Sequence, residues 1–151
     1  MKILLAIDGS KYGEAAAKEL IQRPWPSGTE VRVLSVAHPI PFIPDPVFVI
    51  TAAHYDSLEK EQKRAARDVA RVADEIARTV PSLRVSTQVL EGSPKKEIVE
   101  EAERWGADLI MVGSHGYGPI ERFLLGSVAQ AVALHAPCSV EIVRLQRPAS
   151  H

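Results

Sequence analysis

Short runs of apolar residues alternate along this chain with longer segments in which apolar residues recur every three or four positions. The short runs are typical of strands buried on both faces of a parallel sheet, and the longer periodicity is typical of helices with one face toward the core. The pattern predicts five strands, at residues 2–7, 29–37, 83–90, 107–112 and 139–144.

Four predicted helices accompany these strands, and residues at the helix ends support the assignment. Ser10 is a suitable N-cap for the first helix, which Pro24 ends. A Ser-Pro pair at 93–94 opens the third helix, and Gly106 closes it. The second helix, residues 51–79, has a face of mixed charge that we expect to be solvated. Its opposite face carries an apolar stripe formed by Leu58, Ala65, Val69, Val72, Ile76 and Val80.

Strands separated by helices are joined by right-handed crossovers and therefore run parallel, so the sequence predicts an α/β sheet covered by helices. In such sheets, ligands bind beyond the carboxyl ends of the strands, at the point where the strand order reverses. The loops that follow each strand are therefore the first place to look for a binding site.

Composition is that of an ordinary globular chain: 151 residues, 46% hydrophobic and 25% charged, which we interpret as one domain spanning residues 1–151. The formal net charge of -1 argues against a nucleic-acid or anionic-membrane surface. We expect no signal peptide and no membrane span, because the apolar runs are too short. A single cysteine, Cys138, forms no intrachain disulfide, which suits the cytoplasm.

Glycines gather after the fourth predicted strand, at positions 113, 116, 118 and 126, and Asp8, Gly9 and Ser10 follow the first strand. Both loops lead into helices at one edge of the sheet, where free amides and the helix dipole favour an anion. A purely structural interpretation remains open, in which Asp8 to Ser10 form a turn with an N-cap and Ser127 forms a capping box with Gln130.

Several familiar site patterns are missing from the sequence. There is no G-x-x-x-x-G-K-[ST] phosphate loop, no G-x-G-x-x-G dinucleotide fingerprint and no G-x-S-x-G nucleophile elbow. Neither CxxC nor HExxH metal spacing occurs. The glycine cluster therefore needs another explanation.

The spacing Gly113-x2-Gly116-x9-Gly126-Ser127 resembles the G-x2-G-x9-G-[ST] motif of the universal stress protein family. The resemblance extends over nearly the whole chain, through the segments "ILLAIDGS", "VLSVA", "EGSP" and "DLIMVGSHG". It implies a five-stranded parallel sheet of order 3-2-1-4-5 with helices on both faces, an adenine-nucleotide α-hydrolase-like fold. It also implies ATP, with Mg or Mn bridging the phosphates, at the junction of strands one and four.

The resemblance further implies roles for individual residues. Adenine and ribose would lie against strand one and Val36, the cleft would continue along strand four, and the phosphates would meet the last helix. We expect Asp8 to reach the ribose or a phosphate-bound metal, and Ser114 and His115 to be neighbours of the ligand. The expected site residues are Ala6, Ile7, Asp8, Val36, Val112, Gly113, Ser114, His115, Gly116, Gly126, Ser127 and Val128.

The sequence departs from the family pattern at two positions. Tyr117 stands where relatives often have a basic residue, which leaves the preference for ATP over ADP or AMP open. Glu141 replaces a usual apolar residue in strand 139–144, through which family members commonly form homodimers. That charge either protects the strand edge or faces solvent within a dimer. The proline-rich segment 38–50 is expected to be an extended loop, packed over the long helix or serving as a lid or partner contact.

The leading interpretation is an ATP-binding stress-response or regulatory protein of the cytoplasm, dimeric and with an unidentified protein partner. A second is a slow ATP hydrolase or a phosphoryl or adenylyl transferase, for which Asp8 and His115 are the candidate groups. A third is an interaction module without nucleotide, in which the glycines only shape loops.

Overall fold

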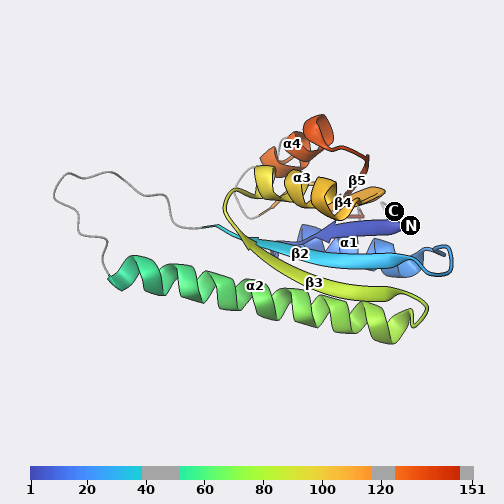
Figure 1. The fold of residues 1–151 in the computed structure, drawn as a ribbon, viewed down its shortest axis with the longest axis horizontal. Helices are drawn as coiled ribbons and strands as arrows, with labels where there is room; N and C mark the ends of the chain where they lie inside the picture. Colours follow the sequence, from blue (N-terminus) through green and yellow to red (C-terminus); the bar gives the residue numbers. More distant parts are fainter. Residues whose placement is uncertain (39–51, 117–124, 147–151) are drawn as a thin grey trace, which may run out of the picture.

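The computed structural model describes residues 1–38, 52–116 and 125–146. One parallel sheet forms the centre of the molecule, in the strand order β3-β2-β1-β4-β5 (Figure 1). Its strands are β1 (Lys2–Ala6), β2 (Glu30–Ala37), β3 (Arg84–Glu91), β4 (Leu109–Gly113) and β5 (Ser139–Val143). The predicted number, direction and order of strands are confirmed, and the strand order reverses between β1 and β4.

Helices cover both faces of the sheet, also as predicted. On one face lie α1 (Lys11–Gln22) and α2 (Ala52–Thr79), and on the other lie α3 (Pro94–Trp105) and α4 (Ser127–His135) (Figure 1). The arrangement follows from strand alternation. Ile3 and Leu5 face the α1 and α2 side, whereas Leu4 and Ala6 face α3 and α4.

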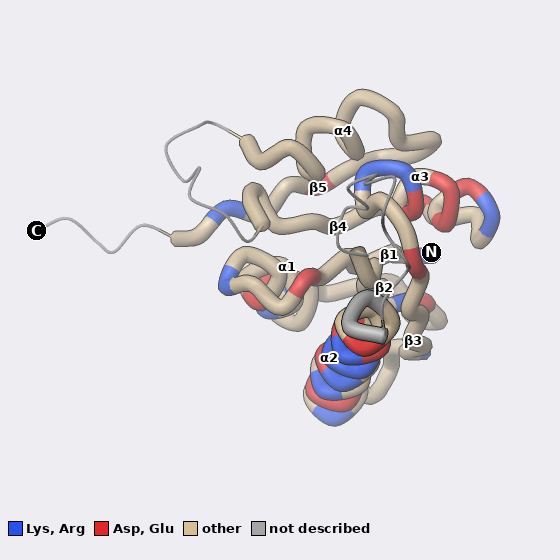
Figure 2. Tube along the Cα trace, turned by 90° about the vertical axis from the view of Figure 1, so that its left-hand side faces the viewer, with Lys and Arg blue, Asp and Glu red and all other residues tan. Residues whose placement is uncertain are grey.

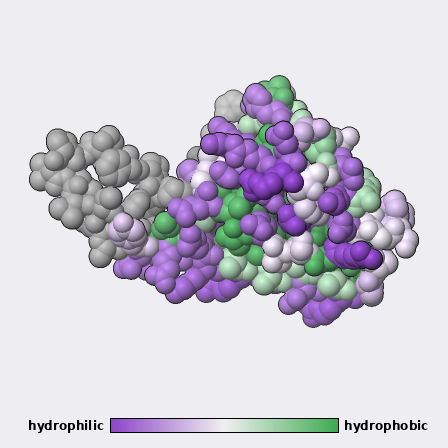
Figure 3. Space-filling view, in the orientation of Figure 1, coloured by the Kyte–Doolittle hydropathy of each residue, from purple (hydrophilic) through white to green (hydrophobic). Residues whose placement is uncertain are grey.

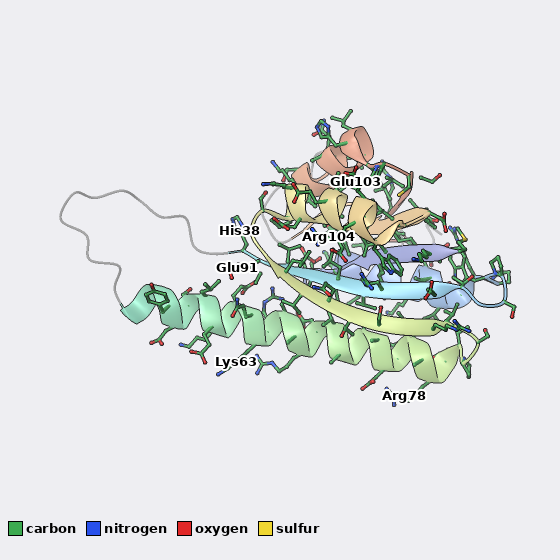
Figure 4. The ribbon with its side chains drawn as sticks, viewed as in Figure 1. His38, Lys63, Arg78, Glu91, Glu103 and Arg104 are labelled. Carbon is green, nitrogen blue, oxygen red and sulfur yellow. The ribbon has the colours of Figure 1, made fainter. Side chains whose placement is uncertain are left out.

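The predicted apolar stripe of α2 packs against the sheet. Ala65, Val69, Val72 and Ile76 are buried there, while the ends of the stripe, at Leu58 and Val80, are half-buried. The opposite face shows both charge signs along its length in Figure 2, and the labelled side chains of Lys63 and Arg78 point away from the sheet in Figure 4. Hydrophilic side chains cover much of the face shown in Figure 3. The expectation of a solvated charged face is confirmed.

The predicted helix-end signals are confirmed at three positions. The Ser10 hydroxyl accepts a hydrogen bond from the amide of Gly13 (3.4 Å), Pro94 is the first residue of α3, and Gly106 ends α3 in the left-handed conformation with φ of 78°.

The capping box proposed at Ser127 is wrong by one residue. Gly126 is the N-cap of α4 and Ser127 is already helical. The cause is a backbone hydrogen bond from the Gly126 amide to the carbonyl oxygen of Ser114 (2.7 Å), which fixes Gly126 in the extended conformation before the helix. Because a glycine has no side chain, α4 begins without a side-chain cap.

A polar cluster holds the end of the sheet at which β1 begins. Glu101 is 3% exposed and pairs with Arg32 (2.7 Å), whose guanidinium lies 4.5 Å from the Trp105 ring centroid. The ammonium of Lys2 donates to the Trp105 carbonyl oxygen (3.1 Å). Burial of a charged pair requires this many partners, since an isolated buried charge is costly. The cluster joins β1, β2 and α3.

Three remaining expectations concern the rest of the chain. Cys138 is partly buried, and this burial raises the pKa of its thiol. Within the described ranges, no helix combines the length and the low polarity that a membrane crossing requires. The proline-rich segment and Tyr117 lie outside the described residues, apart from His38.

Candidate functional site

A cleft of about 1240 Å³ lies at the carboxyl ends of β1 and β4. The ends of β1, β2 and β4 supply its floor, and the first turns of α3 and α4 supply one wall. Part of α2 reaches its rim. The cleft thus opens where the strand order reverses, as parallel α/β sheets generally arrange their ligand sites.

The cleft brings together every residue of the sequence-based site except Ser114. Those that line it are Ala6, Ile7, Asp8, Val36, Val112, Gly113, His115, Gly116, Gly126, Ser127 and Val128. Residues from four separate stretches of the chain therefore meet in one cavity.

Ser114 is buried behind the cleft wall, with 2% of its surface exposed. Its amide donates to the carbonyl oxygen of Val143 (2.8 Å), and its carbonyl oxygen accepts from the Gly126 amide. The Ser114 hydroxyl lies 2.9 Å from Nδ1 of His115. Ser114 therefore joins β5, the start of α4 and the His115 ring, and it orients this histidine instead of lining the cleft.

Asp8 projects its carboxylate into the cleft directly after β1. Oδ1 accepts a hydrogen bond from the Ser10 amide (2.9 Å), and Oδ2 lies over Gly116. A Cβ atom at Gly116 would be 2.7 Å from this oxygen, closer than real side chains allow. The carboxylate therefore lies against Gly116, and it would have to shift to make room for a side chain at position 116.

Gly113 and Gly126 lie where segments of backbone pack closely together. A Cβ at Gly113 would be 2.7 Å from backbone atoms of Tyr12, and one at Gly126 would be 2.9 Å from Cα of His115. Both positions contact protein backbone as well as lining the cleft, so a side chain at either one would disturb the local packing. They let α1 approach β4 and let the loop after β4 lie on the start of α4.

The first turn of α4 supplies amides to the cleft. The Gln130 amide is the first to find an acceptor within the helix, the carbonyl oxygen of Gly126 (3.0 Å). The amides of Ser127, Val128 and Ala129 precede it and have no intrahelical acceptor by helix geometry. With no side-chain cap at Gly126, this helix end presents donors and the positive end of the dipole to the cleft.

The other half of the cleft is apolar. Its lining residues are Leu34 and Val36 of β2, Ile98 of α3, Ala6 of β1 and Val112 of β4. An apolar slot next to a set of amide donors can hold a flat heterocycle at one end and an anion at the other.

The rim nearest β2 is built by α2. Arg64 donates to the carbonyl oxygen of Asp8 (3.2 Å) and to Asp68 (2.6 Å), and it forms an ion pair with Glu61. The hydrogen bond from Arg64 holds the pKa of the Glu61 carboxyl below its ordinary value. His38, which Figure 4 shows beside Glu91 at the ends of β2 and β3, lies 3.2 Å from the carbonyl oxygen of Gly92 through Nδ1.

The chain matches the universal stress protein family over residues 1–144. It belongs to this family.

A relative and a solved structure show how far the similarity extends. A universal stress protein of Methanocaldococcus jannaschii is 36% identical over 143 residues, which cover 95% of this chain and 81% of the relative. The solved structure of the hypothetical protein MJ0577 is 26% identical, covers 97% of both chains and superposes with a TM-score of 0.83.

Two further solved structures share the fold and contain adenine nucleotides. A universal stress protein from Arabidopsis thaliana with AMP bound has a TM-score of 0.65 at 16% identity, covering 97% of this chain and 92% of its own. A universal stress protein in complex with cAMP has a TM-score of 0.62 at 22% identity, covering 95% of this chain and 96% of its own.

Sequence reasoning missed part of the cleft of this universal stress protein. Ser93 and Lys95, at the start of α3, follow β3 and were within reach of the rule that directs attention to loops after strands. Glu61 and Arg64 carried no local signal, since they belong to a charged helix face that otherwise faces solvent. The remaining lining residues are Gly13, Leu34, His38, Pro94, Ile98, Leu125, Ala129 and Gln130.

The potential metal ligands of this universal stress protein do not form a cluster within the described ranges. Among residues 1–38, 52–116 and 125–146, no three of the His, Cys, Asp and Glu side chains come together as a metal site would require. Asp8 lines the cleft beside Gly116. Its carboxylate is a ligand of the type that Mg²⁺ prefers, and a bound phosphate group would supply further oxygen ligands.

Proposed function

We propose that this universal stress protein binds an adenine nucleotide in the cleft between β1 and β4. One observation carries the proposal: an apolar slot, the Asp8 carboxylate and an uncapped helix start line the same cavity. These three features correspond to the base, the sugar and the phosphates of one nucleotide. Two solved proteins of the same fold, with AMP and with cAMP, support this ligand class.

In this proposal each part of the nucleotide has its own partner. Adenine lies between Val36 and Ile98, and the ribose hydroxyls donate to the Asp8 carboxylate. The phosphates accept hydrogen bonds from the amides of Ser127 and Val128. ATP is the ligand we propose, and Mg²⁺ or Mn²⁺ would be held by its phosphates together with Asp8.

Binding, and not rapid turnover, is the role that the donor set supports. A nucleotide held by backbone amides gains affinity from positioned dipoles, whereas fast phosphoryl transfer needs positioned cations and an oriented nucleophile. We propose that the protein is a stress-response regulator in the cytoplasm and that a protein partner binds to its surface. We also propose a homodimer through β5, because this strand lies at the edge of the sheet.

Slow hydrolysis of ATP is a second candidate, and one observation favours it. His115 lines the cleft, and its ring is oriented by the Ser114 hydroxyl at Nδ1 and by Tyr12, whose ring centroid is 5.0 Å away. An oriented imidazole can act as a general base toward water. Single-turnover hydrolysis by the wild type, H115A and D8N separates this activity from passive binding, because only an active protein loses turnover in both variants.

Two measurements on the full chain test the proposed binding. Protein purified without added nucleotide is denatured in acid, and the released small molecules are separated by chromatography. The refolded, nucleotide-free chain is then titrated calorimetrically with AMP, ADP and ATP in the presence of Mg²⁺. We expect an adenine nucleotide in the extract and saturable binding in the titration. An empty extract together with no heat at millimolar nucleotide would favour the interaction module without nucleotide.

A further inference from the structure

The side chain of Arg64 extends from α2 to the residues that follow β1 at the cleft. Its guanidinium donates to the main-chain carbonyl oxygen of Asp8 (3.2 Å). β1 ends at Ala6, so the Asp8 carbonyl lies beyond the ladder that satisfies the strand. The Asp8 carbonyl oxygen thus accepts its hydrogen bond from a charged side chain 56 residues later in the sequence, and not from a neighbouring strand.

The guanidinium is held in place before any ligand arrives. It donates to Asp68 (2.6 Å) four residues later in α2 and forms an ion pair with Glu61 three residues earlier. The side chains of Arg64 and Glu61 are 31% and 32% exposed, so the pairs are partly shielded from water. Two carboxylates balance the charge of Arg64, which makes it a fixed support for the backbone and a poor partner for a phosphate.

What Arg64 supports is the peptide that follows Asp8. Gly9 has φ of 82°, a conformation open to glycine. The hydrogen bond from Arg64 holds the carbonyl group of the preceding peptide in one orientation. In that orientation, Oδ1 of Asp8 accepts from the Ser10 amide (2.9 Å) and Oδ2 lies over Gly116.

We propose that Arg64 is a positioning residue of the nucleotide site, acting through Asp8. By fixing the Asp8 peptide it aims the carboxylate at the sugar end of the cleft, and it makes the first half of α2 part of the site. This inference rests on the proposed nucleotide binding for its effect on affinity. Its effect on the Asp8 loop does not depend on any ligand.

The test compares R64M with R71M in the full chain. Arg71 lies two helical turns further along the same face of α2 and pairs with Glu14 of α1, but it does not line the cleft. Both variants lose a guanidinium and keep the aliphatic stem. R64K is included because an ammonium can restore a hydrogen bond to the Asp8 carbonyl.

The first readout uses nucleotide-free protein. Amide hydrogen exchange, followed by NMR, reports the hydrogen bond between the Ser10 amide and the Asp8 carboxylate. We expect faster exchange at Ser10 in R64M, wild-type exchange in R71M and partial recovery in R64K. Unchanged exchange at Ser10 in R64M overturns the inference, whether or not the protein binds nucleotide.

The second readout is calorimetric titration with ADP and Mg²⁺. R64M should bind about tenfold more weakly than wild type, which corresponds to one charge-assisted hydrogen bond. R71M should bind like wild type. In a D8A background the R64M change should cost nothing further, because the group that it positions is gone. Additive losses would show that Arg64 acts independently of Asp8, and would overturn the inference.

The two readouts separate the two proposals. Faster exchange at Ser10 in R64M, with no nucleotide binding by the wild type, would keep Arg64 as the support of Asp8 and reject the proposed function. Tight binding by the wild type and by R64M alike would keep the proposed function and reject the role of Arg64.

Discussion

Gly113, the last residue of β4, lies against the first turn of α1. The missing side chain leaves room for the backbone of Tyr12, which would be 2.7 Å from a Cβ atom at this position. Backbone atoms cannot move aside as the end of a flexible side chain can, so the contact is intolerant of a methyl group. The close packing of the end of β4 against the start of α1 therefore depends on a glycine at position 113.

Replacing Gly113 by alanine should destabilise the fold. We expect a loss of about 1–3 kcal/mol in the free energy of unfolding, the usual cost of overpacking. The matched control is G13A in the first turn of α1, where the new Cβ would be at an ordinary 3.4 Å from Ile7. That change should be neutral or should stabilise the helix by up to about 1 kcal/mol. Urea unfolding measures both, and equal stabilities would contradict the close contact.

For Gly126, the sequence predicted a place in the site but not the atoms that a side chain would contact. The motif spacing identified Gly126 as part of the site, and it does line the cleft. The atoms that a side chain there would meet belong to Ser114 and His115, in the loop that follows β4, and their position depends on the fold. A bulky substitution at Gly126 would collide with the backbone of His115, so it would test folding as well as ligand binding.

Among the elements, α4 has the clearest link between its structure and the proposed function. It carries no Lys, Arg, Asp or Glu along its length, as the tan tube in Figure 2 shows. Its first turn is exposed to the cleft at Ser127. The positive end of its dipole is therefore not neutralised by any acidic residue of the helix itself.

A negative charge at Ser127 should separate folding from binding. S127E should stabilise α4 by about 0.3–1 kcal/mol through the dipole. It should also weaken nucleotide binding by about tenfold or more, because the new carboxylate repels the phosphates. S127Q has nearly the same size without the charge and is the control. Thermal unfolding and calorimetric titration measure the two effects. Equal nucleotide affinity in S127E and S127Q would argue against phosphates at this helix end.

The edge of β5 offers a test of the proposed homodimer. The carbonyl oxygen of Val143 accepts from Ser114 at the end of β4, so the main-chain groups of Val143 face into the sheet. Main-chain groups alternate in direction along a strand, and those of Val140 and Ile142 therefore face the open edge. The side chain of Glu141 turns toward α1 and pairs with Arg23, so its charge is compensated within the chain.

Proline at Val140 should remove one edge donor without breaking the sheet, since edge strands tolerate proline where the amide faces outward. We expect V140P to be monomeric and V140T, which keeps the amide, to remain dimeric. Sedimentation velocity measures the association state, and circular dichroism checks that the fold is retained. A V140P dimer as stable as that of the wild type would exclude β5 as the interface.

Elements were predictable because their signals are local. The apolar stripe of α2, the Ser10 cap and the left-handed Gly106 each depend on neighbours in the sequence, and each was predicted. Strand ends shifted by one or two residues, as at β4, which begins at Leu109 and not at residue 107. Ser127 was assigned the capping position because its residue type fits, but the bond between Gly126 and Ser114 decides the matter.

For the molecule as a whole, nucleotide binding should appear as added stability. A ligand at a hundred times its Kd stabilises the folded state by about 2.7 kcal/mol. For a chain of this size the melting temperature should rise by about 5–10 °C. Scanning calorimetry with AMP, ADP and ATP measures the shift and ranks the three ligands. If millimolar nucleotide with Mg²⁺ leaves the melting of nucleotide-free protein unchanged, the proposed ligand class is wrong.

The part of the site contributed by α2 became visible only in the folded molecule. Asp8 and Ser127 could be found from motifs because each follows a strand or opens a helix. Arg64 lies in the middle of a helix among other charged residues, and nothing local distinguishes it from Arg71. Only the packing of α2 on the sheet brings one of these arginines to the end of β1 and the other to Glu14.

The positions of Trp25 and Trp105 have a practical consequence. Trp25 follows α1 and Trp105 is the last residue of α3, and both helices have 12 residues and begin at the cleft. About 18 Å of helix therefore separates each indole from the cleft. Tryptophan emission should therefore follow unfolding and stay unchanged when the cleft is filled. Among the described residues, Tyr12 lies beside the cleft, with its ring 5.0 Å from that of the lining residue His115, so a change confined to tyrosine emission would be the optical signature of occupancy.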